Sequence, residues 1–567
     1  MKAEKQAKGR TVLFLITVWL LAASLLGGCS HSQTPVTTPS ISDEQPVPQP
    51  PQWETGFVAS LEPKAVYYDR EGTPVGFLTR GTQVQYRVNT EEETEILVND
   101  TVGYLQGEAT VVTDPAAVIL AHTLYVRTAV NLRDIDGRLL APLAEKGTAV
   151  AVTGCDYVDA AGEVHMYRVA FSGEEGYIMP WYLVDNAADA LANYDNGSYE
   201  VHASRGNRYG GGGAADLDYY PREKGPIQGN EMPAECRTLY LVPWRLGEVD
   251  AYIRIADNSG INAFVVDIAD GSSIGYASDV MQKYCPSAVA AAHNTVEQYQ
   301  AAIQKLKDAG YYVIGRITTF NDSYFIKDHP EYAITDPDGA PLKLSGEYWP
   351  TAYNRTAWQY KVDLAVEAVE LMGFHEIQFD YVRFPDMTYR YEEAGTIDFH
   401  NTYGETKAQA IQRFLMYATD ILHEHGVYVS ADVYGESAYT YVTAYGQYWP
   451  AISNVVDVIS GMPYPDHFAP SGDWLPWEHP YETLNKWGTS AMLRQGETTT
   501  PAMVRTWIQA YNAIREPYNT YGPDEIAAQI RGLRDAGCTG GYMTWNSSAA
   551  RDKYTSFIPA FAPPNGG

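Results

Sequence analysis

The stretch that decides the fold runs from Glu376 to Pro385 and reads Glu-Ile-Gln-Phe-Asp-Tyr-Val-Arg-Phe-Pro. The segment before it, residues 363–374, carries apolar side chains at helical spacing and reaches Gly373, a residue type that favours the end of a helix. This order predicts a helix, a glycine cap and a short apolar strand that ends on the carboxylate of Asp380. Pro385 then ends the segment, because proline has no N–H to donate to a neighbouring strand.

The same order of helix, glycine and short apolar strand recurs along residues 237–550. Helical stretches that end in glycine lie between the strand candidates, which indicates repeated strand and helix units. The eight strand candidates are residues 238–242, 263–267, 312–317, 376–380, 427–432, 456–460, 502–507 and 541–544. Eight such units predict an α/β TIM (β/α)8 barrel with long loops, in which the carboxyl ends of the strands form the active face. A doubly wound sheet fits less well, because the chain lacks a glycine fingerprint.

Two β-rich segments, residues 56–113 and 123–184, precede the barrel and look like copies of one small all-β unit. Residues 72–82 and residues 137–148 each predict a turn, a strand, a loop and a Gly-Thr pair that opens the next strand. The second unit, with Val-Asn-Leu-Arg at 130–133, resembles the bacterial SH3-like domains of cell-envelope proteins, and the first unit matches them more loosely. The resemblance implies either binding to peptidoglycan or a spacer role.

The first 29 residues predict an export signal. Basic residues precede an apolar run at 11–26 that is short for a membrane span. The run closes on Leu-Gly-Gly-Cys, which looks like a bacterial lipobox, where cleavage leaves a lipidated Cys29. We therefore expect an extracytoplasmic lipoprotein tethered to the cell membrane. An ordinary secretory signal or an uncleaved anchor are the alternatives.

The remaining segments predict connections between folded parts. Residues 30–55 are rich in Ser, Thr, Pro and Gln and predict a disordered tether. Residues 185–235 predict a linker rich in Gly and Tyr. The barrel domain is expected over residues 236–560.

Composition narrows the class of partner. The chain has 567 residues and a formal net charge of -30, which argues against a nucleic-acid partner because no basic surface is gathered to neutralise phosphates. Beyond Cys29 there are four widely spaced cysteines, which predict buried free thiols, and no pair at metal-ligand spacing. We expect neither a metal nor another cofactor.

Carboxylates, arginines and aromatic residues are predicted to converge on one rim of the barrel. Glycoside hydrolysis requires two carboxyl groups across a sugar bond, one to donate a proton and one to attack carbon or activate water. Asp380 follows the fourth strand, and Asp432 and Glu436 follow the fifth, so these groups are predicted to be neighbours around the barrel.

Four segments, residues 262–268, 379–385, 430–435 and 462–465, resemble a bacterial family of glycoside hydrolases, a former domain of unknown function with a TIM barrel. The likeness covers about residues 236 to 550. It implies a glycosidase of the same broad type as the α-amylases and α-galactosidases, in which an Asp after the fourth strand is the nucleophile. The amylase-like acid is a Glu after strand five, whereas Asp432 lies nearer the strand end, so the identity of the acid stays open between Asp432 and Glu436.

Roles can be assigned to these residues on chemical grounds. We predict Asp380 as the nucleophile, held ionised by Arg383 or Arg316, because a nearby positive charge favours the charged form. Glu436 is predicted as the acid, with Asp432 as its competitor or as a binder of sugar hydroxyls. The predicted substrate-binding residues are Asp267, Arg316, Tyr381, Arg383, Tyr434, Tyr464, Asp466, His467, Trp507 and Trp545.

Other classes of function fit the sequence less well. A metal-dependent deacetylase or peptidase needs a histidine pair at ligand spacing, which His423 and His425 do not supply. A solute-binding lipoprotein would have two lobes and a hinge. A non-catalytic envelope protein that binds glycan through its barrel is the main alternative to a surface-anchored glycoside hydrolase.

Overall fold

The computed structural model describes residues 52–561 apart from 61–63, 91–92, 107–108, 115–117, 119–122, 160–162, 193, 195–210 and 272. The predicted export signal, the lipidation site at Cys29 and nearly all of the predicted tether lie outside the described residues. Within the described part of the chain, no helix is both long enough and apolar enough to cross a bilayer.

The two β-rich segments form two antiparallel sheets of seven strands each. The first contains β1 (Glu54–Ala59), β2 (Lys64–Tyr68), β3 (Pro74–Thr79), β4 (Gln83–Thr90), β5 (Glu93–Val98), β6 (Thr101–Gln106) and β7 (Thr110–Val112). The second contains β8 (Thr123–Val126), β9 (Val130–Arg133), β10 (Leu139–Ala144), β11 (Ala149–Cys155), β12 (Tyr167–Phe171), β13 (Glu174–Ile178) and β14 (Leu183–Val184).

The two sheets have the same topology. Their strand orders are β3-β2-β6-β5-β4-β1-β7 and β10-β9-β13-β12-β11-β8-β14, which become identical when each sheet is numbered from its own first strand. Gly81 and Gly147, the glycines of the predicted Gly-Thr pairs, have φ values of 87° and 85° and so adopt the same left-handed turn. The repeat predicted from sequence thus has a structural counterpart.

The C-terminal region forms a nearly closed parallel barrel of nine strands. These are β15 (Cys236–Leu241), β16 (Ala263–Asp270), β19 (Tyr312–Thr318), β22 (Glu376–Asp380), β23 (Tyr428–Tyr434), β24 (Val458–Met462), β25 (Met503–Val504), β26 (Thr506–Gln509) and β27 (Gly541–Trp545). Their order is β25-β24-β23-β22-β19-β16-β15-β27-β26. The two ends of this order are separated in sequence only by Arg505, whose N–H donates to the carbonyl oxygen of Ile459 at 3.1 Å. Each of the eight predicted strand segments overlaps at least one of these strands.

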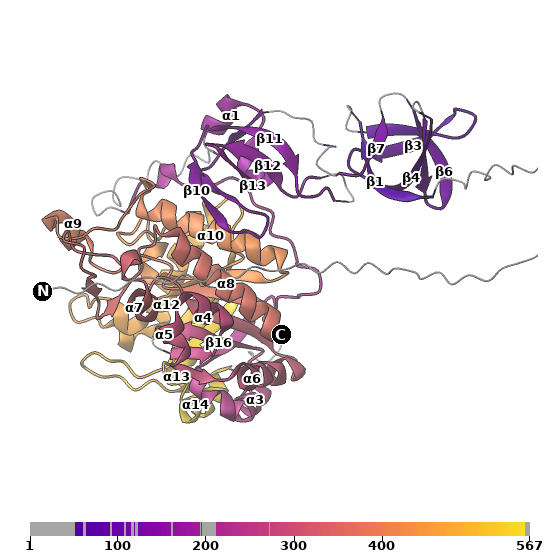
Figure 1. Ribbon diagram of the computed structural model, residues 1–567. Coiled ribbons are helices and arrows are strands. Elements are labelled where there is room, and N and C mark those ends of the chain that lie inside the picture. Colours follow the sequence, from indigo (N-terminus) through magenta and orange to yellow (C-terminus); the bar gives the residue numbers. More distant parts are fainter. Residues whose placement is uncertain are drawn as a thin grey trace, which may run out of the picture. The chain divides into compact units, whose positions relative to one another are not determined.

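Helices surround these strands (Figure 1). The longer helices are α3 (Val249–Asp257), α6 (Val296–Asp308), α8 (Arg355–Met372), α10 (Lys407–Glu424), α12 (Pro480–Gly496), α13 (Pro523–Asp535) and α14 (Arg551–Phe561). The predicted helix before β22 is confirmed, and Gly373 ends it with a left-handed φ of 65°. Shorter elements are α1 (Ala187–Leu191), α4 (Asp279–Tyr284), α5 (Pro286–Val289), α7 (Ser323–Asp328), α9 (Tyr389–Ala394), α11 (Trp449–Ser453), β17 (Ser273–Tyr276), β18 (Ala292–Asn294), β20 (Lys343–Leu344) and β21 (Glu347–Tyr348).

Buried polar contacts join the second β unit to the barrel. The Tyr182 hydroxyl donates to the Asp420 carboxylate on α10 at 2.6 Å, and it accepts from Arg222 at 2.7 Å. All three side chains are buried. Arg222 comes from the segment predicted as a linker, so this part of the segment is held against the barrel.

Candidate active site

Arg316 is the electrostatic centre of the barrel's carboxyl end. It lies on β19, is 1% exposed, and donates through Nη1 to Asp267 at 2.7 Å and through Nε to Asp380 at 3.2 Å. Its Nη1 also lies 3.4 Å from Asp270. The strand register explains this arrangement, because Asp267 pairs with Arg316 across β16 and β19, and Asp380 pairs with Thr318 across β19 and β22.

The backbone holds the second oxygen of Asp380. The Tyr381 N–H donates to Asp380 Oδ1 at 2.6 Å. Tyr381 has a φ of 49°, a left-handed conformation that is uncommon for an aromatic residue. The chain therefore turns sharply at the end of β22, and strain of this kind is often found at functional sites.

Two other carboxyl groups beside Arg316, those of Asp267 and Asp432, are buried, and burial raises the pKa of each. Burial raises the pKa of Asp267 to about 7, against the opposing effect of Arg316. Asp432 on β23 is fully buried, and its Oδ1 accepts from the Trp507 indole N–H at 2.7 Å. Its Oδ2 lies 3.9 Å from Arg316 Nε and has no hydrogen-bond partner among the described residues. Burial and the charge of Asp380 raise the pKa of Asp432 well above its usual range, which favours the neutral acid.

A cavity of about 650 Å³ opens above this cluster. Carboxylates, arginines and aromatic rings share its wall, a combination suited to polar ligands with apolar faces. Its lining residues are Asp270, Arg316, Asp380, Tyr381, Arg383, Asp386, Tyr434, Gly435, Glu436, Tyr439, Tyr441, Met462, Tyr464, His467, Phe468, Ala469, Trp507 and Trp545.

Glu436 is the exposed carboxylate on the β23 side of the cavity. It lies in a short 3-10 helix, Gly435–Ala438, directly after the strand. Its Oε1 accepts from the Tyr441 hydroxyl at 2.7 Å and its Oε2 accepts from the Tyr445 hydroxyl at 3.1 Å. The carboxylate is therefore oriented by two phenols while it remains open to the cavity.

Arg383 belongs to a separate polar cluster on the wall. It donates to the Tyr434 hydroxyl and lies 3.4 Å from Asp386, and Tyr434 in turn donates to Asp386 at 2.9 Å. Of the two arginines predicted to hold Asp380, only Arg316 forms an ion pair with it among the described residues.

The structure divides the predicted site residues into two groups. Asp380, Glu436, Arg316, Tyr381, Arg383, Tyr434, Tyr464, His467, Trp507 and Trp545 line the cavity. Asp267, Asp432 and Asp466 do not line it. Asp466 is 1% exposed and accepts from the Tyr511 hydroxyl at 3.0 Å and from the Ile514 N–H at 3.1 Å, so its contacts are with the surrounding protein.

Several lining residues were not predicted to bind substrate. Asp386 follows directly after the Glu376–Pro385 stretch, so its position in the sequence is a usable signal. Tyr439 and Tyr441 lie in a loop after β23, and only the fold brings them to the rim.

The four cysteines that follow Cys29 are buried free thiols, as predicted. Among the described residues, no group of three or more His, Cys, Asp or Glu is placed to hold a metal ion.

A buried arginine that joins carboxylates beneath an open cavity lined by aromatic rings makes this the candidate active site at the carboxyl end of a parallel barrel. Comparison with known families gives the class of reaction. Residues 238–551 match the family described as "Putative glycosyl hydrolase domain". The chain belongs to this family, and it is an enzyme of the glycoside hydrolase class.

Solved structures that match this chain range widely in sequence identity. A hypothetical protein from Ruminiclostridium thermocellum is 32% identical over 34% of this chain and 97% of its own, with a TM-score of 0.29. A chitobiase from Flavobacterium johnsoniae is 11% identical over 58% of this chain and 48% of its own, with a TM-score of 0.39. The spore cortex-lytic enzyme SleL of Bacillus cereus is 10% identical over 58% and 75%, with a TM-score of 0.35. At TM-scores this low, the likenesses do not establish function. None of the curated proteins compared with the chain matches it.

Proposed function

We propose that this protein hydrolyses O-glycosidic bonds of a polysaccharide or envelope glycan, with Asp380 as the nucleophile and Glu436 as the general acid and base. The observation that carries the proposal is that these two carboxylates, from the ends of neighbouring strands, line one cavity while Asp432 is buried behind it. We also propose that the barrel is a (β/α)8 barrel, in which β25 and β26 are two halves of one strand.

The reaction would proceed in two steps. Asp380 attacks the anomeric carbon, the bond from that carbon to the leaving oxygen breaks, and Glu436 gives its proton to that oxygen. Glu436 then takes a proton from water, whose oxygen attacks the anomeric carbon and releases Asp380. The guanidinium of Arg316 stabilises the carboxylate of Asp380 between turnovers, and the Tyr381 N–H fixes its orientation.

Asp432 serves this site as a neutral, buried neighbour. Because Asp432 is protonated, it places no second negative charge beside Asp380. Two ionised carboxylates in one buried site would repel each other. Trp507 is buried and holds Asp432 through its indole N–H, whereas Trp545 is partly exposed in the cavity and stacks against the sugar.

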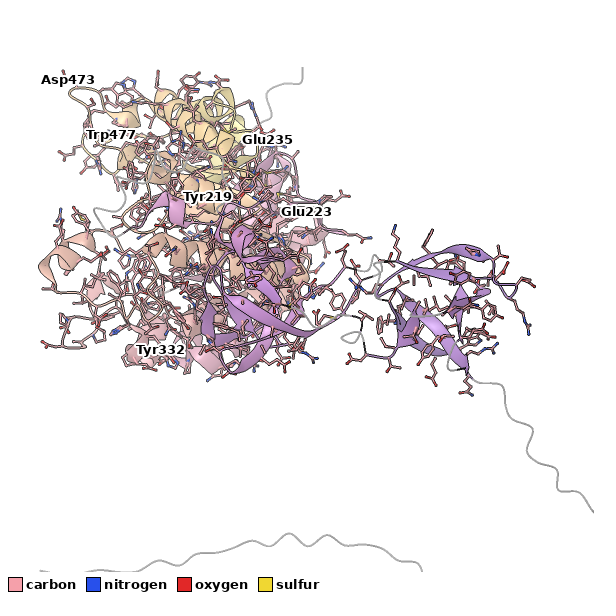
Figure 2. The ribbon with its side chains drawn as sticks, turned by 90° about the horizontal axis from the view of Figure 1, so that it is seen from above. Tyr219, Glu223, Glu235, Tyr332, Asp473 and Trp477 are labelled. Carbon is pink, nitrogen blue, oxygen red and sulfur yellow. The ribbon has the colours of Figure 1, made fainter. Side chains whose placement is uncertain are left out.

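The experiment that tests this function compares the parent chain with Asp380→Asn on a panel of bacterial envelope and exopolysaccharide glycans. Asp473→Asn is the matched control, since Asp473 is exposed at the outer edge of the barrel (Figure 2). We expect new reducing ends from the parent and the control, and a loss of at least about a thousandfold in Asp380→Asn with glycan affinity kept within about tenfold.

Two further measurements make the result specific. Azide added to Asp380→Gly should restore turnover and yield a glycosyl azide, because the small anion replaces the missing nucleophile. Equal glycan binding by parent and Asp380→Asn, with no cleavage of any glycan by either, would instead favour a non-catalytic glycan-binding protein.

The location of the enzyme is a separate proposal. We infer that Cys29 carries a lipid that holds the chain on the outer face of the cell membrane, and that the two β units are SH3-like domains that contact peptidoglycan or act as spacers. The support is the Leu-Gly-Gly-Cys motif and the identical strand order of the two sheets. Cys29→Ala should release the mature chain from membranes, and retention of this variant would contradict the anchor.

A further inference from the structure

A second groove lies next to the proposed active site, between the loop after β23 and helix α12. Its volume is about 340 Å³. The loop contributes Ala438, Tyr439, Thr440 and Tyr441, and α12 contributes Ser490, Leu493 and Arg494. It therefore combines aromatic and aliphatic surface with hydroxyl and guanidinium donors, which is the chemistry that binds sugar rings.

The groove adjoins the catalytic cavity. Tyr439 and Tyr441 line both hollows, so the two share one wall. Tyr439 is 41% exposed at this boundary, and Leu493 is 62% exposed on the far side of the groove. A chain molecule that leaves the catalytic cavity past these tyrosines would enter the groove directly.

Arg494 is a buried cation in the wall of the groove. It is 6% exposed, and only its Nη2 forms an ion pair in the described part of the chain, with Glu497 at 2.8 Å. Its Nε and Nη1 have no hydrogen-bond partner among the described residues. Buried donors are nearly always satisfied in proteins, whereas among the described residues those of Arg494 are only partly satisfied, and the residue keeps a positive charge at the wall of the groove.

The position of the proposed acid, Glu436, indicates which part of the substrate the groove would bind. The Tyr441 hydroxyl, on the shared wall, donates to Glu436 at 2.7 Å. In glycoside hydrolysis the acid protonates the oxygen of the leaving group, so the leaving part of the substrate lies on the acid's side of the broken bond. The groove is therefore on the leaving-group side.

We propose that this groove binds the leaving-group part of a polymeric glycan, so that the enzyme cleaves within chains that extend past Tyr439 and Tyr441. This inference rests on the proposed function, because the leaving-group side is defined by the role given to Glu436. Leu493 and Tyr439 supply apolar faces for a sugar ring, Ser490 supplies a hydroxyl, and Arg494 supplies a positive charge at the wall.

The test uses Leu493→Asp, which changes the groove without touching the catalytic cavity. Leu371→Asp is the matched control, because Leu371 is a half-exposed leucine at the end of α8 that lines neither hollow. Both are assayed on the polymer that the parent cleaves and on an aryl glycoside of the same sugar, whose small leaving group does not reach the groove. Thermal unfolding checks that both variants fold.

We expect Leu493→Asp to lower kcat/KM on the polymer by about tenfold, equivalent to about 1.4 kcal/mol, and to leave the aryl glycoside within about twofold of the parent. Ser490→Trp, which fills the groove, should have the same effect. Polymer cleavage at the parent rate in both groove variants would overturn the inference, and so would an equal loss on both substrates.

Binding separates the inference from the proposed chemistry. In an Asp380→Asn background, affinity for oligosaccharides of increasing length should rise until the groove is filled, and Leu493→Asp should remove the gain from the longer ones. If affinity does not depend on the groove although the parent cleaves the polymer, the groove assignment alone fails. If no glycan is cleaved or bound, the proposed function fails and the groove assignment fails with it.

Discussion

Replacing Arg316 with methionine tests whether the site depends on one buried charge. Methionine removes the guanidinium and keeps an unbranched side chain of similar length. Arg316 is 1% exposed and pairs with Asp267 at 2.7 Å and with Asp380 at 3.2 Å. Both carboxylates are themselves buried, so the substitution leaves them without a cation. Removing one partner of a buried ion pair costs about 3–5 kcal/mol, and we expect a loss of this size in the free energy of unfolding at pH 8.

The loss should depend on pH with a defined sign. Burial already raises the pKa of Asp267 to about 7 with Arg316 in place. Without the cation, the folded-state pKa of Asp267 lies further above the unfolded value of about 4. A raised folded-state pKa means that stability is fully present below the unfolded pKa and is lost as the pH rises through the folded pKa. Arg316→Met should therefore lose less stability at pH 5 than at pH 8.

Urea unfolding at both pH values, followed by tryptophan fluorescence, measures the effect at constant ionic strength. Lys305→Met is the control, because Lys305 pairs with Asp250 at 2.9 Å on the exposed surface. Surface pairs contribute about 0–1 kcal/mol, so this variant should stay within that range. A loss below about 1 kcal/mol for Arg316→Met at pH 8, or an equal loss at both pH values, would refute the reasoning.

Three further substitutions test single contacts by urea unfolding. Tyr182→Phe removes the hydroxyl that joins the second β unit to Asp420. It should lower the free energy of unfolding by about 1–3 kcal/mol, because the buried Asp420 carboxylate loses a hydrogen-bond donor. An unchanged stability would mean that water replaces the contact. Gly373→Ala places a side chain at a φ of 65° and should cost about 1 kcal/mol, and a neutral result would show that the helix end relaxes. Trp507→Phe removes the hydrogen-bond donor to Asp432 and should lower the free energy of unfolding by about 1–3 kcal/mol. Glycan cleavage should fall as well. Full stability would show that Asp432 finds another partner.

The regular part of the barrel could be predicted because its signals are local. Predicted residues 376–380 agree with β22, since an apolar run between a glycine and a proline has little freedom in where it begins and ends. The predicted segment 502–507 is instead divided into two short strands at Arg505. The Arg505 side chain pairs with Glu376 inside the barrel at 2.8 Å, and that partner lies more than a hundred residues earlier in the chain. No local pattern reports such a contact.

The site was predictable in outline for a related reason. Residues at the ends of parallel strands share one rim, so Asp380, Tyr434 and Trp545 could be placed together from sequence. The position of a loop residue does not follow from the strand order. Tyr439 reaches the rim because its loop packs against α12. Sequence also does not tell an open carboxylate from a covered one, as Asp466 shows: it follows a strand end, yet neighbouring loops enclose it.

The choice between Asp432 and Glu436 follows from the direction of the strand. Side chains alternate along β23, and Asp432 points into the barrel, where Trp507 and Arg316 enclose it. Glu436 lies two residues beyond the strand's end, in a turn that frees its side chain from that alternation. A general acid must reach the bridging oxygen of a bound substrate. The geometry therefore favours Glu436, although the pKa of Asp432 is the one that burial raises. Glu436→Gln should abolish cleavage of substrates with poor leaving groups and spare those whose leaving group needs no proton, whereas Asp432→Asn should act on both alike.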